Sequence, residues 1–259
     1  MNETYQEYIS RVTQLILPGT CSIQLQTIQT SPKFVDGRAV DFPGYSIITP
    51  PNAEDSDNQK FYERIEFLQQ SITQQLEPGF IVPLPAKSFH FTIADLIWDD
   101  SYRQAVKENP QFEAELQKQI AQSFAQYKKK QKSEERTPIE WQLLGISIRP
   151  RAIMASLVPK DQNSYRAIVD LRGEIYQNAG LIGLGIEQQY DFTAHITLGY
   201  FDRLNSNLNR SRVCVIVSQI SDRLLESEPI IMTVKGAELR KFDNMVHYHR
   251  QPDWSAISF

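Results

Sequence analysis

Apolar residues recur along this chain at two different periods, which divide it into helices and strands. An apolar residue at every third or fourth position predicts four amphipathic helices, at residues 3–16, 58–76, 110–130 and 162–178. Pro18 should end the first helix, and Asn109 and Pro110 suit the N-cap and first position of the third. The signals conflict over residues 205–226, because VCVIV favours a strand whereas its flanks favour a helix.

Short alternating or continuous apolar runs fill the intervals between these helices and predict strands. Asp36-Gly37 predicts a turn ahead of the first buried strand. We expect strands at residues 21–28, 45–48, 88–96, 193–201, 230–243 and 244–251, and two more that meet at Arg149-Pro150. No stretch rich in Pro, Gly or Ser divides the chain, so the sequence gives no sign of a flexible linker.

Two of the predicted strands share one pattern: apolar, His, apolar, Thr, apolar. The first, FHFTI, follows the second predicted helix, and the other, AHITL, follows the fourth. Residues two apart point to the same face of a strand, so His90 lies beside Thr92 and His195 lies beside Thr197. The opposite face of each strand is apolar, and we expect it to pack against the helix that precedes the strand.

Two imidazoles and two hydroxyls suit an attack at phosphorus. Imidazole titrates near neutral pH, so one ring can accept a proton from water while the other donates a proton to the departing oxygen. The hydroxyls of Thr92 and Thr197 can bind the phosphate oxygens. A single such motif is more often an ordinary strand, and the repetition is what favours catalysis. We expect His90, Thr92, His195 and Thr197 to be catalytic, with no metal and no cofactor.

The two motifs, HFT at 90–92 and HIT at 195–197, resemble the signature of the two-histidine (2H) phosphoesterases, the LigT-like and cyclic phosphodiesterase proteins. PGYSIITPP and VKGAELRKFD resemble neighbouring strands of that family, and the likeness extends over residues 34–250. It implies a bilobal α+β fold, with two antiparallel sheets facing a central cleft and helices outside. It also implies action on 2′,3′-cyclic phosphates of nucleotides or RNA ends, or on related 2′-5′ or cyclic phosphodiesters.

The same resemblance implies a division of the chain. Residues 34–259 would form a single bilobal phosphoesterase domain with a helical insert at about 103–135, and residues 1–33 an accessory helix and strand. The KKKQKSEER run at 128–136 fits the cationic last turn of a helix followed by a solvated loop, or a basic edge that guides a phosphate.

Composition limits the partners of the chain. The net charge of −4 and the pI near 5.7 do not favour long nucleic acids or anionic membranes, but they allow a small anionic substrate such as a nucleotide or an RNA end. The N-terminal residues MNETYQEYIS lack a secretory pattern, and no apolar run is long enough to span a membrane. Cys21 and Cys214 form no metal-binding spacing. A reduced, cytoplasmic protein is the expected setting.

Three other features compete with the repeated motif. His247 and His249 could share a metal on one strand face and support a metal-dependent hydrolase. No carboxylate or third His completes the pair, although Asp243 and Asp253 are near in sequence, and a polar edge strand near the terminus is the favoured interpretation. Gly180, Gly183 and Gly185 match no phosphate-loop spacing, which favours a flexible loop. Trp98 and Trp141 could stack on a base but are more typical of a core. A non-enzymatic nucleotide- or RNA-binding module that uses the same cleft is the other alternative.

Overall fold

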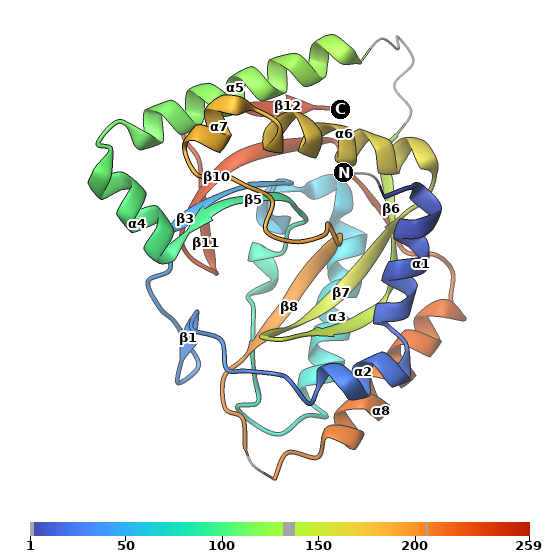
Figure 1. Ribbon diagram of the computed structural model, residues 1–259. Coiled ribbons are helices and arrows are strands. Elements are labelled where there is room, and N and C mark those ends of the chain that lie inside the picture. Colours follow the sequence, from blue (N-terminus) through green and yellow to red (C-terminus); the bar gives the residue numbers. More distant parts are fainter. Residues whose placement is uncertain (1–2, 132–137, 206) are drawn as a thin grey trace.

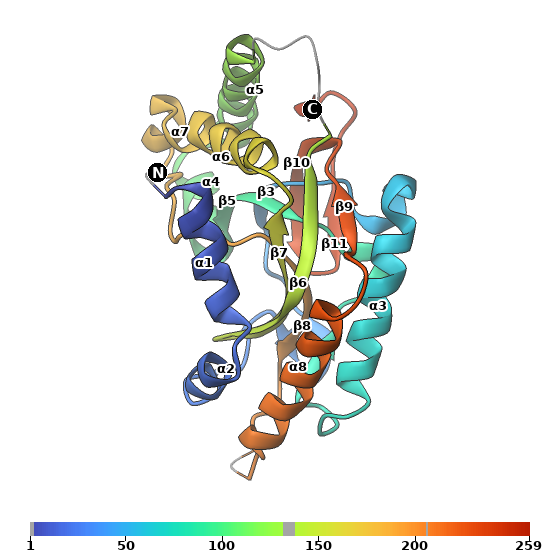
Figure 2. The same ribbon diagram turned by 90° about the vertical axis from the view of Figure 1, so that its right-hand side faces the viewer.

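Two antiparallel sheets form the centre of the computed structural model, which describes residues 3–131, 138–205 and 207–259. One sheet has the strand order β11-β10-β3-β5 with β12 beside β10, and the other has the order β4-β8-β7-β6-β9. We call them the first and the second sheet, because β5 contains Thr92 of the first motif and β8 contains the second motif. Helices lie outside both sheets (Figures 1 and 2). The expected α+β fold is confirmed.

The first sheet carries its helices at the top of Figure 1. Its strands are β3 (Gly44–Ile48), β5 (Thr92–Trp98), β10 (Gly236–Asn244), β11 (His247–His249) and β12 (Ala256–Ser258). The helices on this side are α4 (Asp99–Glu108), α5 (Phe112–Lys130), α6 (Gln162–Tyr176) and α7 (Ala179–Gly183). Glu113 of α5 joins helix and sheet, since its carboxylate accepts hydrogen bonds from Tyr45 and Lys241 at 2.9 and 2.7 Å.

The second sheet is the more strongly curled of the two (Figure 2). Its strands are β4 (Ile81–Pro83), β6 (Glu140–Arg149), β7 (Ala152–Pro159), β8 (His195–Phe201) and β9 (Ile231–Thr233). The helices around it are α1 (Tyr5–Leu15), α2 (Pro18–Gln24), α3 (Gln59–Thr73) and α8 (Arg210–Leu225). β1 (Phe34–Val35) and β2 (Arg38–Ala39) form a separate hairpin, and its turn residues Asp36 and Gly37 have φ of 49° and 77°, as expected for Asp-Gly. Short 3₁₀ turns cover Asn52–Glu54, Ser56–Asn58 and Ala86–Ser88.

The two halves of the chain exchange their helices. α3 precedes the first motif but packs against β4 and β8 of the second sheet, while α6 precedes the second motif and packs against β5 of the first. Gln69 of α3 donates to the Leu198 carbonyl of β8 at 2.6 Å, and Arg172 of α6 donates to the Ile93 carbonyl of β5. The expectation that each strand packs against the helix before it is therefore wrong. Periodicity identifies the apolar face of a helix but not the sheet that buries it.

An aromatic cluster joins the halves at the centre. Phe91, directly after His90, packs against Trp141 and Phe192, with ring centroids 5.2 and 6.1 Å away. Tyr8 of α1 packs against the same Trp141 at 5.9 Å. These side chains are almost completely buried. The predicted core role of Trp141 is confirmed, and one continuous core lies behind both motifs.

Several predicted elements differ in the structure. Residues 21–28 form the end of α2 and a turn rather than a strand, because Cys21, Leu25 and Ile28 are buried at helical spacing while Ile23 is exposed. The ambiguous segment 205–226 contains the helix α8, and residues 230–243 divide into β9 and β10, which belong to different sheets.

The predicted start of one helix and several short elements also differ from the structure. Helix α5 begins at Phe112 rather than at Pro110, and the Asn109 side chain accepts from Gln111 ahead of it. The sequence pattern did not identify the short elements α4, α7 and β12.

The basic run and the absence of a membrane span were two further expectations from the sequence. Lys128–Lys130 form the cationic last turn of α5, while residues 132–136 of the basic run, with the end of the helical insert, lie outside the described residues. Within the described ranges no helix has the length and apolar character needed to cross a bilayer.

Candidate active site

The two motif histidines are held in the same way. The Nδ1 atom of His90 lies 2.7 Å from the carbonyl oxygen of Ser88, and the Nδ1 atom of His195 lies 2.7 Å from that of Thr193. A carbonyl oxygen can only accept a hydrogen bond, so Nδ1 carries the proton in both rings. The Nε2 atom of each neutral ring therefore has a free lone pair and can take up or release a proton.

Burial affects both imidazoles. The pKa of His90 is lowered to about 4, chiefly by burial and also by the nearby charge of His195, while the hydrogen bond to Ser88 opposes the shift. Burial likewise lowers the pKa of His195, and the positive charge of Arg149 acts in the same direction. Both rings are consequently neutral at pH 7 in the free protein, and His195 is close enough to His90 for its charge to affect the pKa of His90.

A β-bulge follows each motif directly. In the pairing of β3 with β5, Ile47 and Ile48 face Ala94 and Thr92, so Ile93 is an extra residue. In the pairing of β7 with β8, Ile153 and Met154 face Gly199 and Thr197, so Leu198 is the extra residue there. An extra residue reverses the alternation of side chains beyond it.

The bulges return two further residues to the strand face of the motif histidines. Asp95 and Tyr200 stand at equivalent positions, five residues after His90 and His195. The negative charge of Asp95 acts to raise the pKa of both histidines. The Tyr200 hydroxyl lies 3.4 Å from Met245 and 3.4 Å from the ammonium group of Lys33. Strict alternation would assign Ala94 and Gly199 to these places, which is why the sequence reading missed both residues.

The exchanged helices satisfy the carbonyl groups of the bulges. The extra residue Leu198 accepts from Gln69 of α3, and the extra residue Ile93 accepts from Arg172 of α6. Gln69 and Arg172 are both buried, at 7% and 3% exposure, so water cannot replace them easily. Each bulge is thus fixed by a side chain from the other half of the chain.

The N-terminal helix positions the second motif. Tyr8 of α1 accepts from the backbone N–H of Ala194 at 2.9 Å and donates to the Leu157 carbonyl at 3.2 Å. Arg11 donates to the Thr193 hydroxyl at 3.0 Å. Burial raises the pKa of Tyr8, so its hydroxyl stays protonated. Helix α1 therefore contacts the chain just before His195 and the neighbouring strand β7, a role that its sequence did not indicate.

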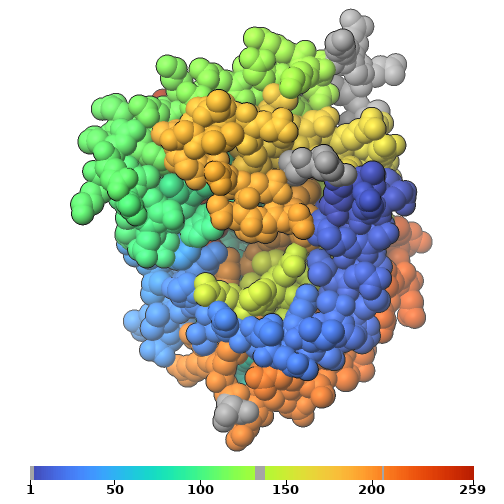
Figure 3. Space-filling view, in the orientation of Figure 1, coloured from blue at the N-terminus to red at the C-terminus, as the bar shows by residue number. Residues whose placement is uncertain are grey.

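Cationic groups lie around the histidines. Lys33 and Arg149 both act to lower the pKa of His195, and burial lowers the pKa of the Arg149 guanidinium itself. Arg149 forms no ion pair with any carboxylate of the described residues. It lies at the end of β6, in the β6–β7 region whose yellow-green atoms occupy the hollow in Figure 3. A half-buried cation with no carboxylate partner in the described part of the chain is suited to an anionic ligand.

Both threonines accompany their histidines as expected. Thr92 and Thr197 are partly exposed, whereas Phe91, Ile93, Ile196 and Leu198 beside them are buried. Tyr248 of β11 stacks against the His90 ring with centroids 4.4 Å apart. The arrangement can transfer protons at two points around a small anion, with hydroxyl and cationic groups nearby.

The structure places the three competing features of the sequence differently from one another. His247 and His249 lie on one face of β11, and the structure corrects the expectation that no carboxylate joins them, because Asp243 lies 3.0 and 3.6 Å from their Nδ1 atoms. Gly180 and Gly183 belong to helix α7 rather than to a flexible loop. Trp98 packs against the core at the end of β5.

Comparisons with known proteins concern the fold. No family model matches the sequence, and no curated protein matches it. Among solved structures, a conserved protein of unknown function from Agrobacterium tumefaciens matches with a TM-score of 0.60 and 13% identity, over 85% of this chain and 90% of the other.

Escherichia coli LigT in complex with 3′-AMP also matches, with a TM-score of 0.45 and 13% identity over 84% of this chain and 98% of LigT. A Thermus thermophilus protein matches with a TM-score of 0.42 and 15% identity, over 76% of this chain and 86% of the other. The chain shares the α+β fold of the Agrobacterium protein over nearly its whole length.

Proposed function

We propose that this chain is a metal-independent phosphodiesterase that hydrolyses the 2′,3′-cyclic phosphate of a nucleotide or an RNA end, or a related cyclic or 2′-5′ phosphodiester. The observation that carries the proposal is the pair of imidazoles with matching Nδ1 hydrogen bonds, which leaves two Nε2 atoms to exchange protons. The cyclic phosphate itself is inferred from the resemblance of the two His-x-Thr motifs to the two-histidine phosphoesterases.

In the proposed reaction, the oxygen of a water molecule attacks phosphorus while one Nε2 accepts its proton. The bond from phosphorus to one ribose oxygen breaks, and the Nε2–H of the other imidazole protonates that oxygen, which gives a phosphomonoester. Thr92 and Thr197 would donate hydrogen bonds to the phosphate oxygens. The phosphate charge would favour the protonated form of the acid, whose pKa burial lowers in the free protein.

The cations near His195 support an anionic substrate. Arg149 and Lys33 would offset the negative charge that develops on the phosphate oxygens as the ring bond breaks. Tyr248 lies against His90 and offers an aromatic surface near the phosphate. The near-equivalence of the two imidazoles leaves both assignments of acid and base open.

The test is the hydrolysis of 2′,3′-cyclic mononucleotides in excess chelator. We expect His90→Ala and His195→Ala each to lower kcat by about 10²–10⁴-fold, because each removes one proton-transfer group. Lys118→Ala, an exposed change on the outer helix α5, should leave the rate unchanged. The proposal is wrong if both folded histidine variants keep the wild-type rate.

The same assay separates the two alternatives. Nucleotide binding without turnover in the wild type, retained in both histidine variants, would identify a binding module. Activity that is lost in chelator and restored by a divalent metal would identify a metal-dependent hydrolase at His247 and His249.

A further inference from the structure

The β10–β11 hairpin has two different faces. Tyr248 points inward, against His90 and Phe242, with ring centroids 4.4 and 5.3 Å away. Its neighbours His247 and His249 lie on the opposite face of the strand, with ring centroids 5.2 Å apart. This outer face is therefore separate from the candidate active site, although the same short strand forms both.

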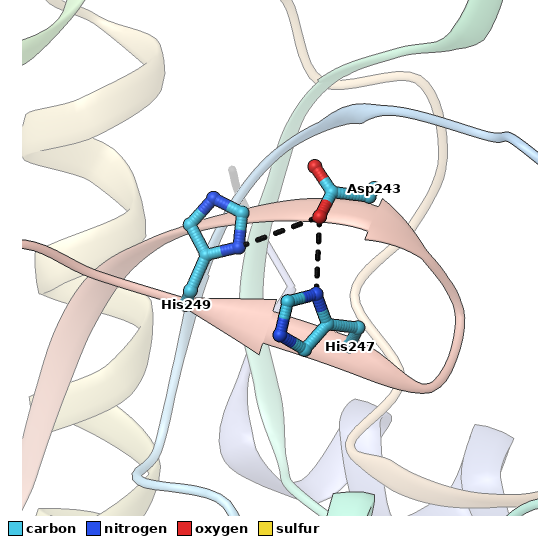
Figure 4. Close-up of side chains that lie close together, drawn as sticks. All are labelled: Asp243, His247 and His249. Carbon is cyan, nitrogen blue, oxygen red and sulfur yellow. Dashed lines mark hydrogen bonds and ion pairs between the residues drawn. The ribbon is translucent and has the colours of Figure 1, made fainter.

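A bulge in β10 places a carboxylate between the two imidazoles. The pairing passes from Phe242 and Tyr248 to Asn244 and His247, which leaves Asp243 as the extra residue. The carbonyl of Asp243 accepts from the backbone N–H of Phe42 at 2.8 Å, so its backbone is fixed. One carboxylate oxygen, Oδ2, faces both rings, at 3.0 Å from Nδ1 of His247 and 3.6 Å from Nδ1 of His249 (Figure 4).

These separations match the coordination shell of a small metal ion. Bonds of about 2.0–2.1 Å to a tetrahedral zinc ion place neighbouring ligand atoms about 3.3 Å apart. The three ligand atoms of Asp243, His247 and His249 all lie within 4.8 Å of one another. Two imidazoles and one carboxylate are also the donor set of borderline transition metals rather than of magnesium or calcium.

We propose that Asp243, His247 and His249 bind a divalent transition-metal ion, with zinc as the representative, on the outer face of the β10–β11 hairpin. The side chains are 47%, 64% and 34% exposed, so an ion can enter from solvent and water can complete its shell. Each imidazole binds as the neutral ring, and any proton on Nδ1 moves to Nε2 or to solvent. The ion would join β10 to β11 and so fix the strand that carries Tyr248.

The experiment measures zinc binding to untagged protein by equilibrium dialysis, with cobalt absorption as a report on the ligands. We expect one ion per chain. His247→Ala, His249→Ala and Asp243→Asn should each weaken binding by about tenfold or more, since loss of even an outer-shell partner costs that much. Zinc should also slow amide exchange in β11 of the wild type, because the ion bridges the two strands.

The matched control is His195→Ala, which removes an imidazole from the candidate active site and should bind zinc as the wild type does. The proposal fails if the wild type binds no more tightly than the His247→Ala/His249→Ala double variant. It also fails if His195→Ala loses binding to the same degree, because the ion would then lie at the candidate active site. A cobalt spectrum that stays that of the free aqueous ion in the wild type would contradict it independently of any variant.

Discussion

A histidine whose Nδ1 proton is bonded to a carbonyl has its tautomer and its ring orientation fixed at once. Ser88 does this for His90, and Thr193 does it for His195. The carbonyl comes from two residues before the histidine in each case, so the bond is local: Ser88 ends the 3₁₀ turn ahead of β5, and Thr193 precedes β8. The surroundings then determine the pKa, and burial lowers it in both rings.

This burial predicts a loss of stability in mild acid. The pKa of His90 is about 4 when folded and 6.5 in the reference state, so between these values the unfolded chain binds a proton that the folded chain does not. The free energy of unfolding should therefore fall as the pH drops from 6.5 to 4, by up to about 3 kcal/mol from this group. Urea titrations at several pH values would measure it.

The control for that measurement is His90→Gln, which has no group to titrate at this position. Its free energy of unfolding should fall less steeply than that of the wild type over the same pH range. If the free energy of unfolding depends on pH in the same way for both proteins, His90 has the same pKa in the folded and unfolded states, which contradicts the prediction.

At the scale of elements, each motif strand depends on a helix from the other half. The bulges at Ile93 and Leu198 return Asp95 and Tyr200 to the strand face of the histidines. Arg172 and Gln69 donate hydrogen bonds to the carbonyls of the extra residues. An unsatisfied buried carbonyl is costly, so these two polar side chains stabilise the irregular backbone beside the site.

Gln69→Leu should lower the free energy of unfolding by about 1–3 kcal/mol, because it leaves the Leu84 carbonyl without its side-chain donor and the Leu198 carbonyl with only the backbone N–H of Leu84. Gln70→Leu makes the same chemical change one residue away on the exposed side of α3, and should change it by less than about 0.5 kcal/mol. Chemical denaturation of both variants checks this. Equal losses would mean that the hydrogen bonds to the bulge contribute nothing.

The sequence could predict the faces of these elements but not their partners. The alternation of apolar and polar residues identified the candidate site residues His90, Thr92, His195 and Thr197. The helical period identified the buried faces of the long helices. Strict alternation places Asp95 on the wrong face of β5, because nothing in the local sequence marks the extra residue before it. The position of Asp243 could not be predicted either, since Asp243 joins His247 and His249 only through the bulge in β10.

At the scale of the whole molecule, the exchange of helices makes the two sheets interdependent. The cluster of Phe91, Trp141 and Phe192 extends the core across both, and Tyr8 of the N-terminal helix packs into it. The first sheet also combines β3 and β5 with β10, β11 and β12 from the other end of the chain, so neither sheet forms from one half of the sequence alone.

We therefore expect a single unfolding transition in calorimetry. Its calorimetric enthalpy should equal the van't Hoff enthalpy, at about 180 kcal/mol near 60 °C for 259 residues. Gln69→Leu should shift that one transition to a lower temperature without dividing it. Two separate transitions would show that the sheets unfold independently despite the shared helices.

The topology also sets an order in which the chain can complete its site. β10, β11 and β12 follow the second motif in the sequence but pair with the first sheet, and β11 carries Tyr248 against His90. During synthesis from the N-terminus, the surroundings of His90 can therefore be complete only after the strands that follow the second motif have been made.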